Sequence, residues 1–271
     1  MTRPLTEDQR AFQETAERFT REKIAPLYMA REKDGRVDRA LVREMGALGL
    51  IGADLPERYG GLGESSVTAG LAIEALAYGD INVSYIPLLA SLNGQIIARH
   101  AAPELASAWI PRIVSGEALF CIALTEPRGG SDAANLALSA RRDGDSYIIK
   151  GEKSSISMAD QADAAVVFAR TGPAEAGARG VSAFLVPMDT PGISTTRFKD
   201  LGSHAIGRGS IFFDEVRIPA SHRLAEEGMG FVQVMQGFDY SRALIGLQCC
   251  AAAQASLDES WSYITERQSF G

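Results

Sequence analysis

The sequence has few of the residues that build metal sites. Among its 271 residues, cysteine occurs at Cys121, Cys249 and Cys250, and the three histidines are scattered. Cys249 and Cys250 are neighbours in an apolar helical stretch, so they cannot share a helical face, and they lack the spacing of a zinc site. We therefore expect buried, unreactive thiols and no metal centre.

Long runs of basic or apolar residues are also missing. No Lys/Arg-rich stretch occurs and the formal net charge is −7, which argues against nucleic acid or an anionic membrane surface as the main partner. No apolar run approaches the roughly 20 residues that cross a bilayer, so no membrane span is expected. The N-terminus resembles neither a signal peptide nor a transit peptide, and we expect a cytoplasmic protein.

What remains is an ordinary soluble composition, with 46% apolar and 23% charged residues. A chain of this length can bury a substantial core. The period of the apolar residues changes twice, which predicts a helical domain over 1–116, an all-β domain over 117–226 and the first part of a second helical domain over 227–271. The predicted fold class is therefore α+β.

The first 116 residues carry helix signals. Thr6 followed by Gln9 is a capping-box pattern, and apolar residues at helical spacing continue it as one amphipathic helix over 7–30. Asp38 can cap the next helix, and Pro103 suits the first turn of the last one. Further helices are predicted over 66–79, 83–100 and 103 to about 115.

The middle of the chain carries strand signals. Asp143-Gly144 is a hairpin turn signal, and Ala174–Gly180 is predicted to be a flexible, exposed hairpin loop. Apolar or β-branched runs bounded by Gly, Pro and Asp predict the strands, which are Phe120–Leu124, Ala137–Arg141, Ser146–Lys150, Ala164–Ala169, Val181–Pro187 and Ile211–Phe213. From about Gly228 the helical period returns and continues to Ile264.

The stretch Phe120–Asp132, F-C-I-A-L-T-E-P-R-G-G-S-D, is the most informative in the chain. An apolar run of strand length breaks at proline and opens into a Gly-Gly loop, with hydroxyls at Thr125 and Ser131. Such a loop can present backbone N–H groups to a polar ligand. A tight surface turn is the simpler interpretation of the residues alone.

This stretch resembles the T-E-P-x-x-G-S-D motif of the acyl-CoA dehydrogenases, flavoenzymes that desaturate acyl-CoA thioesters. Four further segments are similar to family motifs: P-E-R-Y-G-G-L-G from Pro56, G-E-K-S-S-I-S from Gly151, F-D-Y-S-R from Phe238 and R-Q-S-F-G from Arg267. The resemblance covers essentially the whole chain. It implies the order helical, β, helical, and it implies further helices after Gly271.

The resemblance implies an FAD site at two strand ends. Thr125 matches the residue that contacts the flavin pyrimidine ring, and Ser157 matches the hydroxyl that binds flavin N5. Ser155 stands where the family has a tryptophan, a departure that implies a more open site and bulkier substrates. Polar ends of strands and turns are the simpler interpretation. The cofactor contacts that the resemblance implies are Ile122, Leu124, Thr125, Gly130, Ser131, Ser155, Ile156 and Ser157, with Arg267 and Ser269 on the FAD diphosphate of a neighbouring subunit.

The resemblance also implies an acyl-CoA site. Ser131 and Thr171 match positions near the CoA, and the segment Asp239, Tyr240, Ser241 and Arg242 matches one that touches the substrate. Asp239 and Arg242 could equally form a pair along one helical face. Some family members carry the catalytic glutamate at the position of Ser241, which is no base here, so the catalytic residue is unknown and is expected beyond Gly271.

The implied function is FAD-dependent α,β-dehydrogenation of an acyl-CoA, with electrons passed to an electron-transfer flavoprotein by a homo-oligomer, a tetramer or a dimer. Residues 1–271 alone are expected to be inactive. Two alternatives stay open: a flavin monooxygenase or oxidase on the same scaffold, and a non-catalytic flavin- or CoA-binding subunit or fragment.

Overall fold

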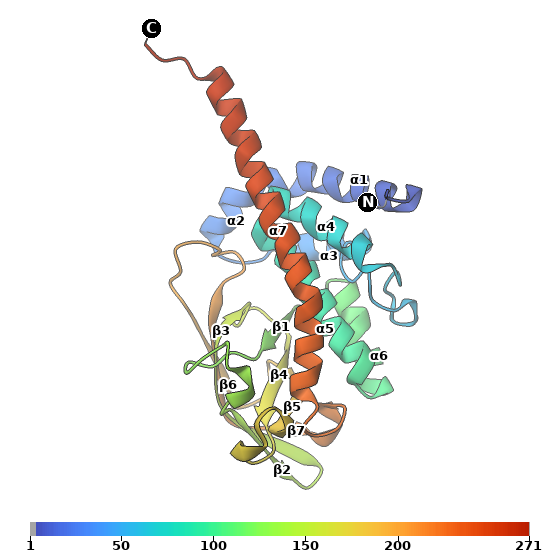
Figure 1. The fold of residues 1–271 in the computed structure, drawn as a ribbon, viewed down its shortest axis with the longest axis vertical. Coiled ribbons are helices and arrows are strands. Elements are labelled where there is room, and N and C mark those ends of the chain that lie inside the picture. The colour runs from blue at the N-terminus through green and yellow to red at the C-terminus, as the bar shows by residue number, and fades with distance from the viewer. Residues whose placement is uncertain (1–3, 271) are drawn as a thin grey trace.

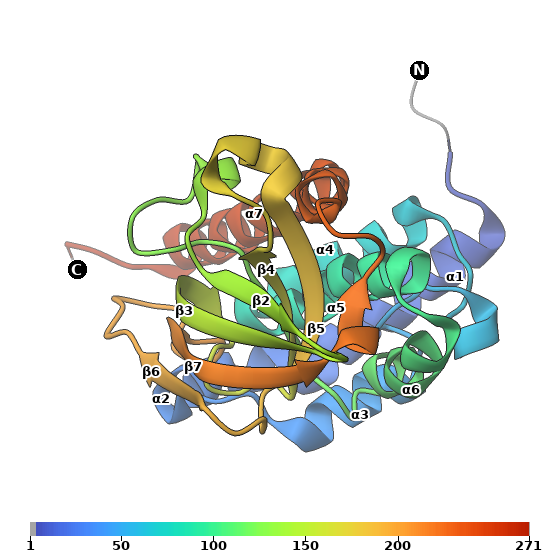
Figure 2. The ribbon, with the colours of Figure 1, turned by 90° about the horizontal axis from the view of Figure 1, so that it is seen from below.

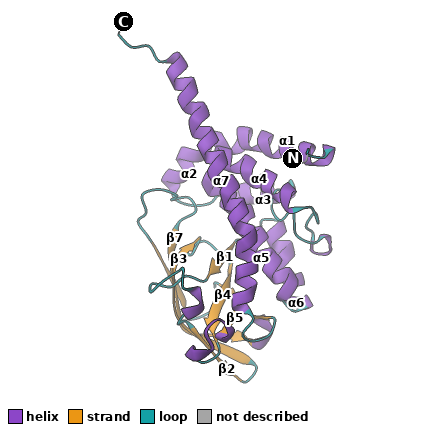
Figure 3. Ribbon diagram, viewed as in Figure 1, coloured by secondary structure: helices purple, strands orange, loops and turns teal. Residues whose placement is uncertain are grey.

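The computed structural model describes residues 4–270 and has the predicted α+β class. The helices gather on one side of the molecule and the strands on the other, and the last helix runs past both (Figures 1 and 3). The α-helices of the described chain are α1 Glu7–Phe19, α2 Tyr28–Asp34, α3 Arg39–Ala47, α4 Ser66–Gly79, α5 Ile81–His100, α6 Pro103–Val114 and α7 Gly230–Glu266.

Caps set several helix starts as predicted. In α1, Thr6 Oγ1 accepts from Gln9 N at 3.2 Å while Gln9 Oε1 accepts from Thr6 N at 3.1 Å, which completes the capping box. The Asp38 carboxylate accepts from Ala40 N at 2.8 Å and begins α3. Pro103 lies in the first turn of α6, where its missing N–H has no cost.

The prediction of one continuous helix over 7–30 is wrong in its middle. After α1 the chain forms a π-helical turn, Thr20–Ile24, and a 3₁₀ turn, Ala25–Leu27, before α2 begins. The end of α4 approaches this irregular turn closely, because a Cβ on Gly79 would lie 2.5 Å from Thr20 Cγ2 and 3.3 Å from Ala25 N. Tertiary packing therefore overrides the helical period here.

Within the part of the chain that the structure describes, one helix is long and apolar enough to cross a membrane by length and composition. It is α5, whose most apolar window has a mean hydropathy of 1.2. Serines, asparagines and a glycine interrupt its apolar residues, so the sequence shows no continuous apolar run there. In the structure 78% of that window is buried inside the fold. Burial among the other elements accounts for its apolar composition.

The strands form one eight-stranded sheet in the order β6-β7-β3-β2-β4-β5-β8, with β1 paired in parallel to β4. The long antiparallel pair β3–β7 runs along one edge of this domain (Figure 2). Strands β6 and β8 were not predicted. The bounds are β1 Phe120–Ala123, β2 Ser139–Asp143, β3 Ser146–Ser157, β4 Ala164–Arg170, β5 Val181–Pro187, β6 Ile193–Arg197, β7 Arg208–Pro219 and β8 Arg223–Leu224.

Ala174–Gly180 connects the antiparallel strands β4 and β5, as predicted for a hairpin loop, and forms 3₁₀ turns around Gly177, whose φ of +54° is accessible to glycine. One surface prediction is wrong. Cys249 and Cys250 are exposed rather than buried, whereas Cys121 is buried as expected. The apolar residues around the cysteine pair do not all face the core, because only part of α7 is covered.

Helix α7 is buried along one side of its first two thirds and exposed beyond. Residues such as Val234, Leu244 and Ala251 pack against α4, α5 and β5. From residue 252 onward nearly every side chain is exposed, including Leu257 and Trp261. Asp258 still accepts from the Tyr78 hydroxyl of α4 at 2.8 Å, whereas the end of α7 and the chain that follows it project away from the other helices (Figure 1).

Candidate functional site

The predicted flavin residues come from two strand ends that meet. Strand β1 ends at Ala123 and leads into Leu124 and Thr125, while β3 ends at Ser157. Ser154 N donates to Thr125 O at 2.9 Å, which joins the two segments directly. The structure therefore brings the T-E-P motif and the G-E-K-S-S-I-S motif into one place.

The end of β3 is bulged. Its pairing with β7 shifts register between Lys153, opposite Ile211, and Ile156, opposite Gly209. Ser155 takes up the extra residue with a φ of +59°, in the left-handed region that non-glycine residues rarely adopt. The bulge turns the side chains at the strand end, so Ser155 is exposed and Ser157 half-buried.

The Gly-rich loop folds back on Thr125. A Cβ on Gly130 would lie 3.3 Å from Thr125 Cγ2 and 3.6 Å from its Oγ1, whereas Gly129 has open space around it. Gly129 N donates to Glu126 O at 3.0 Å and closes the turn. Ser131 lies beyond this turn and is exposed. A larger residue at position 130 would crowd the threonine, so the close approach explains one of the two glycines.

The Thr125 and Ser157 hydroxyls are available to a ligand. Both residues are half-buried, and neither hydroxyl has a hydrogen-bond partner within residues 4–270. Ser157 lines a cavity of about 360 Å³ together with Tyr85 of α5 and Arg208 of β7. A half-buried hydroxyl without a partner on a cavity wall, as at Ser157, fits the polar edge of a ring such as the flavin, which needs donors along that edge.

Three other predicted cofactor residues are apolar. Leu124 and Ile156 are buried in the core, and Ile122 is half-buried in β1 opposite Val166 of β4. Their apolar side chains hold the strand ends in place. Hydrogen bonds from these positions to a polar ligand would come from backbone groups, because the side chains carry no polar atoms.

The space at Ser155, where the resemblance implies a missing aromatic wall, is flanked by an arginine. Arg208 Nη1 lies 3.5 Å from Ser155 Oγ, and the Arg208 guanidinium pairs with Asp200 at 2.7 Å and 3.0 Å. The Arg208 guanidinium carbon also lies 5.5 Å from the centre of the Phe198 ring. The Asp200 hydrogen bond raises the pKa of Arg208, which stays charged throughout the usual range.

Tyr85 forms the opposite side of the same cavity. It lies on α5, is half-buried, and packs against the core cluster. Burial and the nearby Cys249 raise the pKa of Tyr85, so its hydroxyl remains protonated at neutral pH and can donate. No sequence pattern signals this role, because Tyr85 is one aromatic residue on an otherwise apolar helix.

A buried ion pair lies directly beneath Thr125. Lys153 of β3 is completely buried, and its Nζ donates to Glu126 Oε1 and to Leu124 O, each at 2.9 Å. Burial lowers the pKa of Lys153 to about 8, although Glu126 opposes the shift. Burial alone would raise the pKa of Glu126. Lys153 and the N–H groups of Leu138 and Ala137 outweigh it and lower the pKa of Glu126 below its ordinary value.

Thr171, predicted near the CoA, lies at a junction of three elements. Its Oγ1 is 2.7 Å from Ser182 Oγ, which also accepts from Gly228 N at 2.9 Å just before α7. The neighbouring Arg170 holds the loop after Ser131, because its guanidinium donates to Leu136 O at 2.9 Å and to Ala134 O at 2.6 Å. Thr171 is thus fixed from both sides.

The four α7 residues predicted to touch substrate face in different directions. Asp239 and Arg242 are exposed and pair with each other at 2.8 Å, the alternative that their spacing allowed. Ser241 is buried and its Oγ lies 3.4 Å from Phe238 O, one turn back. Tyr240 Oη is buried without a hydrogen-bond partner in the described chain, and burial with the nearby Asp54 raises the pKa of Tyr240.

Arg267 and Ser269 lie apart from all the other predicted residues, in the chain that follows α7 (Figure 1). Both are exposed, and the Arg267 guanidinium carbon is 5.9 Å from the centre of the Tyr263 ring. Gly271, the last residue of this motif, lies outside the described residues. The structure does not bring this motif to the strand-end residues of the same chain.

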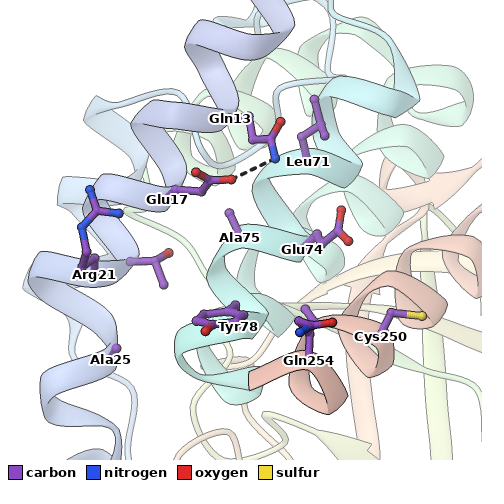
Figure 4. Close-up of a pocket in the computed structure, with 12 residues that line it drawn as sticks. Gln13, Glu17, Arg21, Ala25, Leu71, Glu74, Ala75, Tyr78, Cys250 and Gln254 are labelled. Atoms are coloured by element: carbon purple, nitrogen blue, oxygen red, sulfur yellow. Dashed lines mark hydrogen bonds between the residues drawn. The ribbon is translucent and has the colours of Figure 1, made fainter. Parts of the chain in front are cut away.

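A larger cavity lies elsewhere, between α1, α4 and α7 (Figure 4). It measures about 640 Å³ and includes Glu17, Tyr78 and Gln254 on its walls. None of the predicted flavin or substrate residues lines it. Its size alone does not make it the functional site.

Three carboxylates of the described chain, Glu126, Asp239 and Glu266, are candidates for the base, and none is suited to that role. Glu126 is used fully by Lys153 and two backbone N–H groups. Asp239 is exposed and paired with Arg242, and Glu266 is exposed at the end of α7. The carboxylate on the cavity of Ser157 is Asp200, which pairs with Arg208.

Comparison with known sequence families gives consistent matches along the chain. Residues 6–117 match the family model "Acyl-CoA dehydrogenase, N-terminal domain", residues 121–216 match the middle domain, and residues 228–271 match the C-terminal domain. The matched segments follow the helical, sheet and helical parts of the structure in order.

Individual proteins are also similar. The short-chain specific acyl-CoA dehydrogenase of Homo sapiens mitochondria is 35% identical over 98% of this chain and 65% of its own length. The probable acyl-CoA dehydrogenase YngJ of Bacillus subtilis (strain 168) is 34% identical over 98% of this chain and 71% of its own. A glutaryl-CoA dehydrogenase from Mycobacterium smegmatis in complex with FADH2 has a TM-score of 0.90 at 32% identity, covering 98% of this chain and 67% of that one. The chain thus spans about two thirds of the length of these proteins.

Proposed function

Because the chain belongs to the acyl-CoA dehydrogenase family, we propose that the full-length protein is an FAD-dependent acyl-CoA dehydrogenase. The observation that carries the proposal is the joining of the strand ends that hold Thr125 and Ser157, through the hydrogen bond from Ser154 N to Thr125 O, with the Ser157 hydroxyl on a cavity. The M. smegmatis relative with a similar fold was crystallised with FADH2, which supports the same cofactor here. The FAD would bind without a covalent bond, because no predicted contact residue is a cysteine or histidine.

The reaction removes two hydrogens from an acyl-CoA thioester. A carboxylate would accept the α-proton, the β-hydrogen would leave as a hydride, and a double bond would form between the two carbons. FAD supplies the two-electron acceptor when it is bound. The thioester carbonyl requires donors as negative charge develops on its oxygen.

The chain's own residues would bind and orient. Thr125 would hold the pyrimidine edge of the ring and Ser157 would donate to N5, while Tyr85 limits the space available on the α5 side of the cavity. Ser131 and Thr171 are proposed to contact the CoA end of the substrate, with Tyr240 and Ser241 facing inward from α7. Asp239 and Arg242 offer an exposed charged pair near the surface.

The proton acceptor is proposed to lie outside residues 4–270. The candidate carboxylates Glu126, Asp239 and Glu266 are either engaged or distant, and Ser241 has no partner that would activate it. The relatives extend well beyond the length of this chain, which leaves room for such a residue. We further propose that electrons leave to an electron-transfer flavoprotein and that the protein is a cytoplasmic homo-oligomer.

The proposal is tested by purifying the full-length protein and following its flavin. It should be yellow, release FAD on denaturation, and lose its oxidised flavin absorbance anaerobically with at least one member of a panel of short, branched and long acyl-CoAs. A protein that takes up no FAD would refute the assignment. Rapid reoxidation by oxygen after reduction would favour an oxidase or monooxygenase instead, and FAD binding without reduction by any acyl-CoA would favour a non-catalytic subunit.

A further inference from the structure

The pair Lys153–Glu126 encloses a single residue, Thr125. Lys153 Nζ donates to Leu124 O on one side of Thr125 and to Glu126 Oε1 on the other, each at 2.9 Å. The side chains are 0% and 4% exposed. One buried cation thus fixes the backbone before the threonine and the side chain after it.

The carboxylate extends this contact to a third segment. Glu126 Oε2 accepts from Ala137 N at 2.7 Å, and Oε1 accepts from Leu138 N at 2.8 Å, just before β2. Both donors are backbone N–H groups, so they remain whatever side chains stand at positions 137 and 138. The pair therefore ties the end of β1, the middle of β3 and the start of β2 together at one point.

Stability alone is a weak reason for this arrangement. Transferring both charges from water to the core is expensive, and well-packed apolar residues often serve the fold as well as a buried ion pair. What the pair adds is geometry: with Ser154 N holding Thr125 O at 2.9 Å, the peptide groups on both sides of Thr125 are fixed. The Thr125 hydroxyl remains free and points from a rigid backbone.

We propose that Lys153 and Glu126 are positioning residues that set the orientation of Thr125, and of the backbone beside it, toward the polar edge of the bound flavin ring. This proposal rests on the proposed function. It assigns the pair a role in ligand binding in addition to its role in the fold.

The chain contains a matched control on the same strand. Lys150 of β3 pairs with Glu215 at the same distance, 2.9 Å, but the two side chains are 62% and 56% exposed. The control variant is Lys150→Met/Glu215→Gln. The test variants are Lys153→Met, Glu126→Gln and the double variant Lys153→Met/Glu126→Gln, in which no unpaired charge is left in the core.

Three quantities are measured in the full-length protein: the Kd for FAD by flavin fluorescence, the visible absorption spectrum of the bound flavin, and urea unfolding without FAD. Lys153→Met should unfold at lower urea and bind FAD at least tenfold more weakly. The double variant should recover most of the urea midpoint but not the FAD affinity, and its bound flavin should have an altered spectrum. The control pair should change the Kd less than twofold.

Recovery of both the urea midpoint and the FAD affinity in the double variant would show that the pair serves the fold only. If Lys153→Met does not accumulate as folded protein, the FAD affinity and flavin spectrum of Glu126→Gln test the inference instead. This substitution is isosteric and keeps an acceptor for Leu138 N. An unchanged Kd and spectrum in Glu126→Gln would overturn the inference. A wild-type protein that binds no FAD would refute the proposed function instead, which separates the two failures.

Discussion

Two regions of this molecule carry residues predicted to hold FAD, and the fold treats them differently. At the strand ends, Thr125 and Ser157 come from separate strands that are joined by backbone hydrogen bonds and a buried ion pair. In distal α7, Arg267 and Ser269 follow a helix end that nothing in the described chain covers. Contacts within this chain fix the geometry of the first region. The side chains of the second region are exposed, and no contact within the described chain fixes their geometry. Substitutions should therefore have large effects in the first region and small ones along exposed α7.

The largest effect is expected from Gly209→Ala on β7, opposite the bulge of β3. A Cβ at Gly209 would lie 1.8 Å from Thr196 O, so the β6–β7 pairing must shift. Overpacking against backbone should lower the free energy of unfolding by about 3 kcal/mol. Urea unfolding measures this loss.

The control is Gly246→Ala on the exposed side of α7, where no atom lies within 4 Å of the new Cβ. It should raise the free energy of unfolding by about 0.5–1 kcal/mol, the helix preference of alanine over glycine. Equal urea midpoints for the two variants would contradict the contrast between the regions.

The next effect is expected from Thr125→Val, which keeps the side-chain shape and removes the hydroxyl. Loss of a buried hydrogen bond to a polar ring costs about 1–3 kcal/mol, which weakens FAD binding by roughly 5- to 150-fold. Ser256→Ala is the control, because the Ser256 hydroxyl bonds only to Ala252 O of the same exposed helix turn, at 2.9 Å. If titration with FAD gives the same Kd for both variants, the strand-end loop is only a turn.

A smaller effect is expected from Arg208→Met, which removes the charge beside Ser155. The exposed Arg208–Asp200 pair contributes about 0.2–1 kcal/mol to folding, so stability should change little. FAD binding should weaken by a few-fold, because Arg208 lines the cavity of Ser157. Arg217→Met on the same strand breaks the comparable exposed pair with Asp143 and should leave FAD affinity unchanged. Identical FAD titrations for the two variants would remove Arg208 from the site.

The smallest effect is a pH dependence at the 3₁₀ turn Ala220–His222, between β7 and β8. Burial lowers the pKa of His222 below its ordinary 6.5, and its Nδ1 lies 3.1 Å from Leu185 O. A lowered pKa means that the unfolded chain binds the proton more readily, so the His222 contribution is full above pH 6.5 and is lost as the pH falls through the folded-state pKa. His222→Gln should flatten the fall in urea midpoint below pH 6.5. The pKa of His100 is also lowered by burial, but His100 is present in both proteins, so their difference isolates His222.

Much of the fold could be predicted because its signals are local. Caps at Thr6, Asp38 and Pro103 depend on a few neighbouring residues, and the helix starts agree with them. Strand β6 has no such signal: its residues alternate between half-buried and exposed, and it becomes a strand only by pairing with β7. The break after α1 likewise depends on Gly79, which is distant in sequence.

Part of the geometry of the candidate site could be predicted for a similar reason. Thr125 and Ser157 lie in short motifs that can be recognised from the sequence, and the hydrogen bond from Ser154 N to Thr125 O joins these motifs in the structure. Lys153 and Glu126 stand in the same motifs, yet nothing in the sequence says that a lysine on a strand turns inward to meet a glutamate 27 residues away. Tyr85 reaches the cavity only through the packing of α5 against the sheet.

The exposed cysteine pair of α7 makes the molecule convenient to label. Burial raises the pKa of the Cys121 thiol to about 12, so a maleimide at neutral pH should spare it and react with Cys249 and Cys250. Cys249 lies close enough to Tyr85 to affect its pKa, and Tyr85 lines the cavity of Ser157. A Cys250→Ser protein carrying one environment-sensitive dye on Cys249 would therefore place an optical reporter near Tyr85 without altering either strand end.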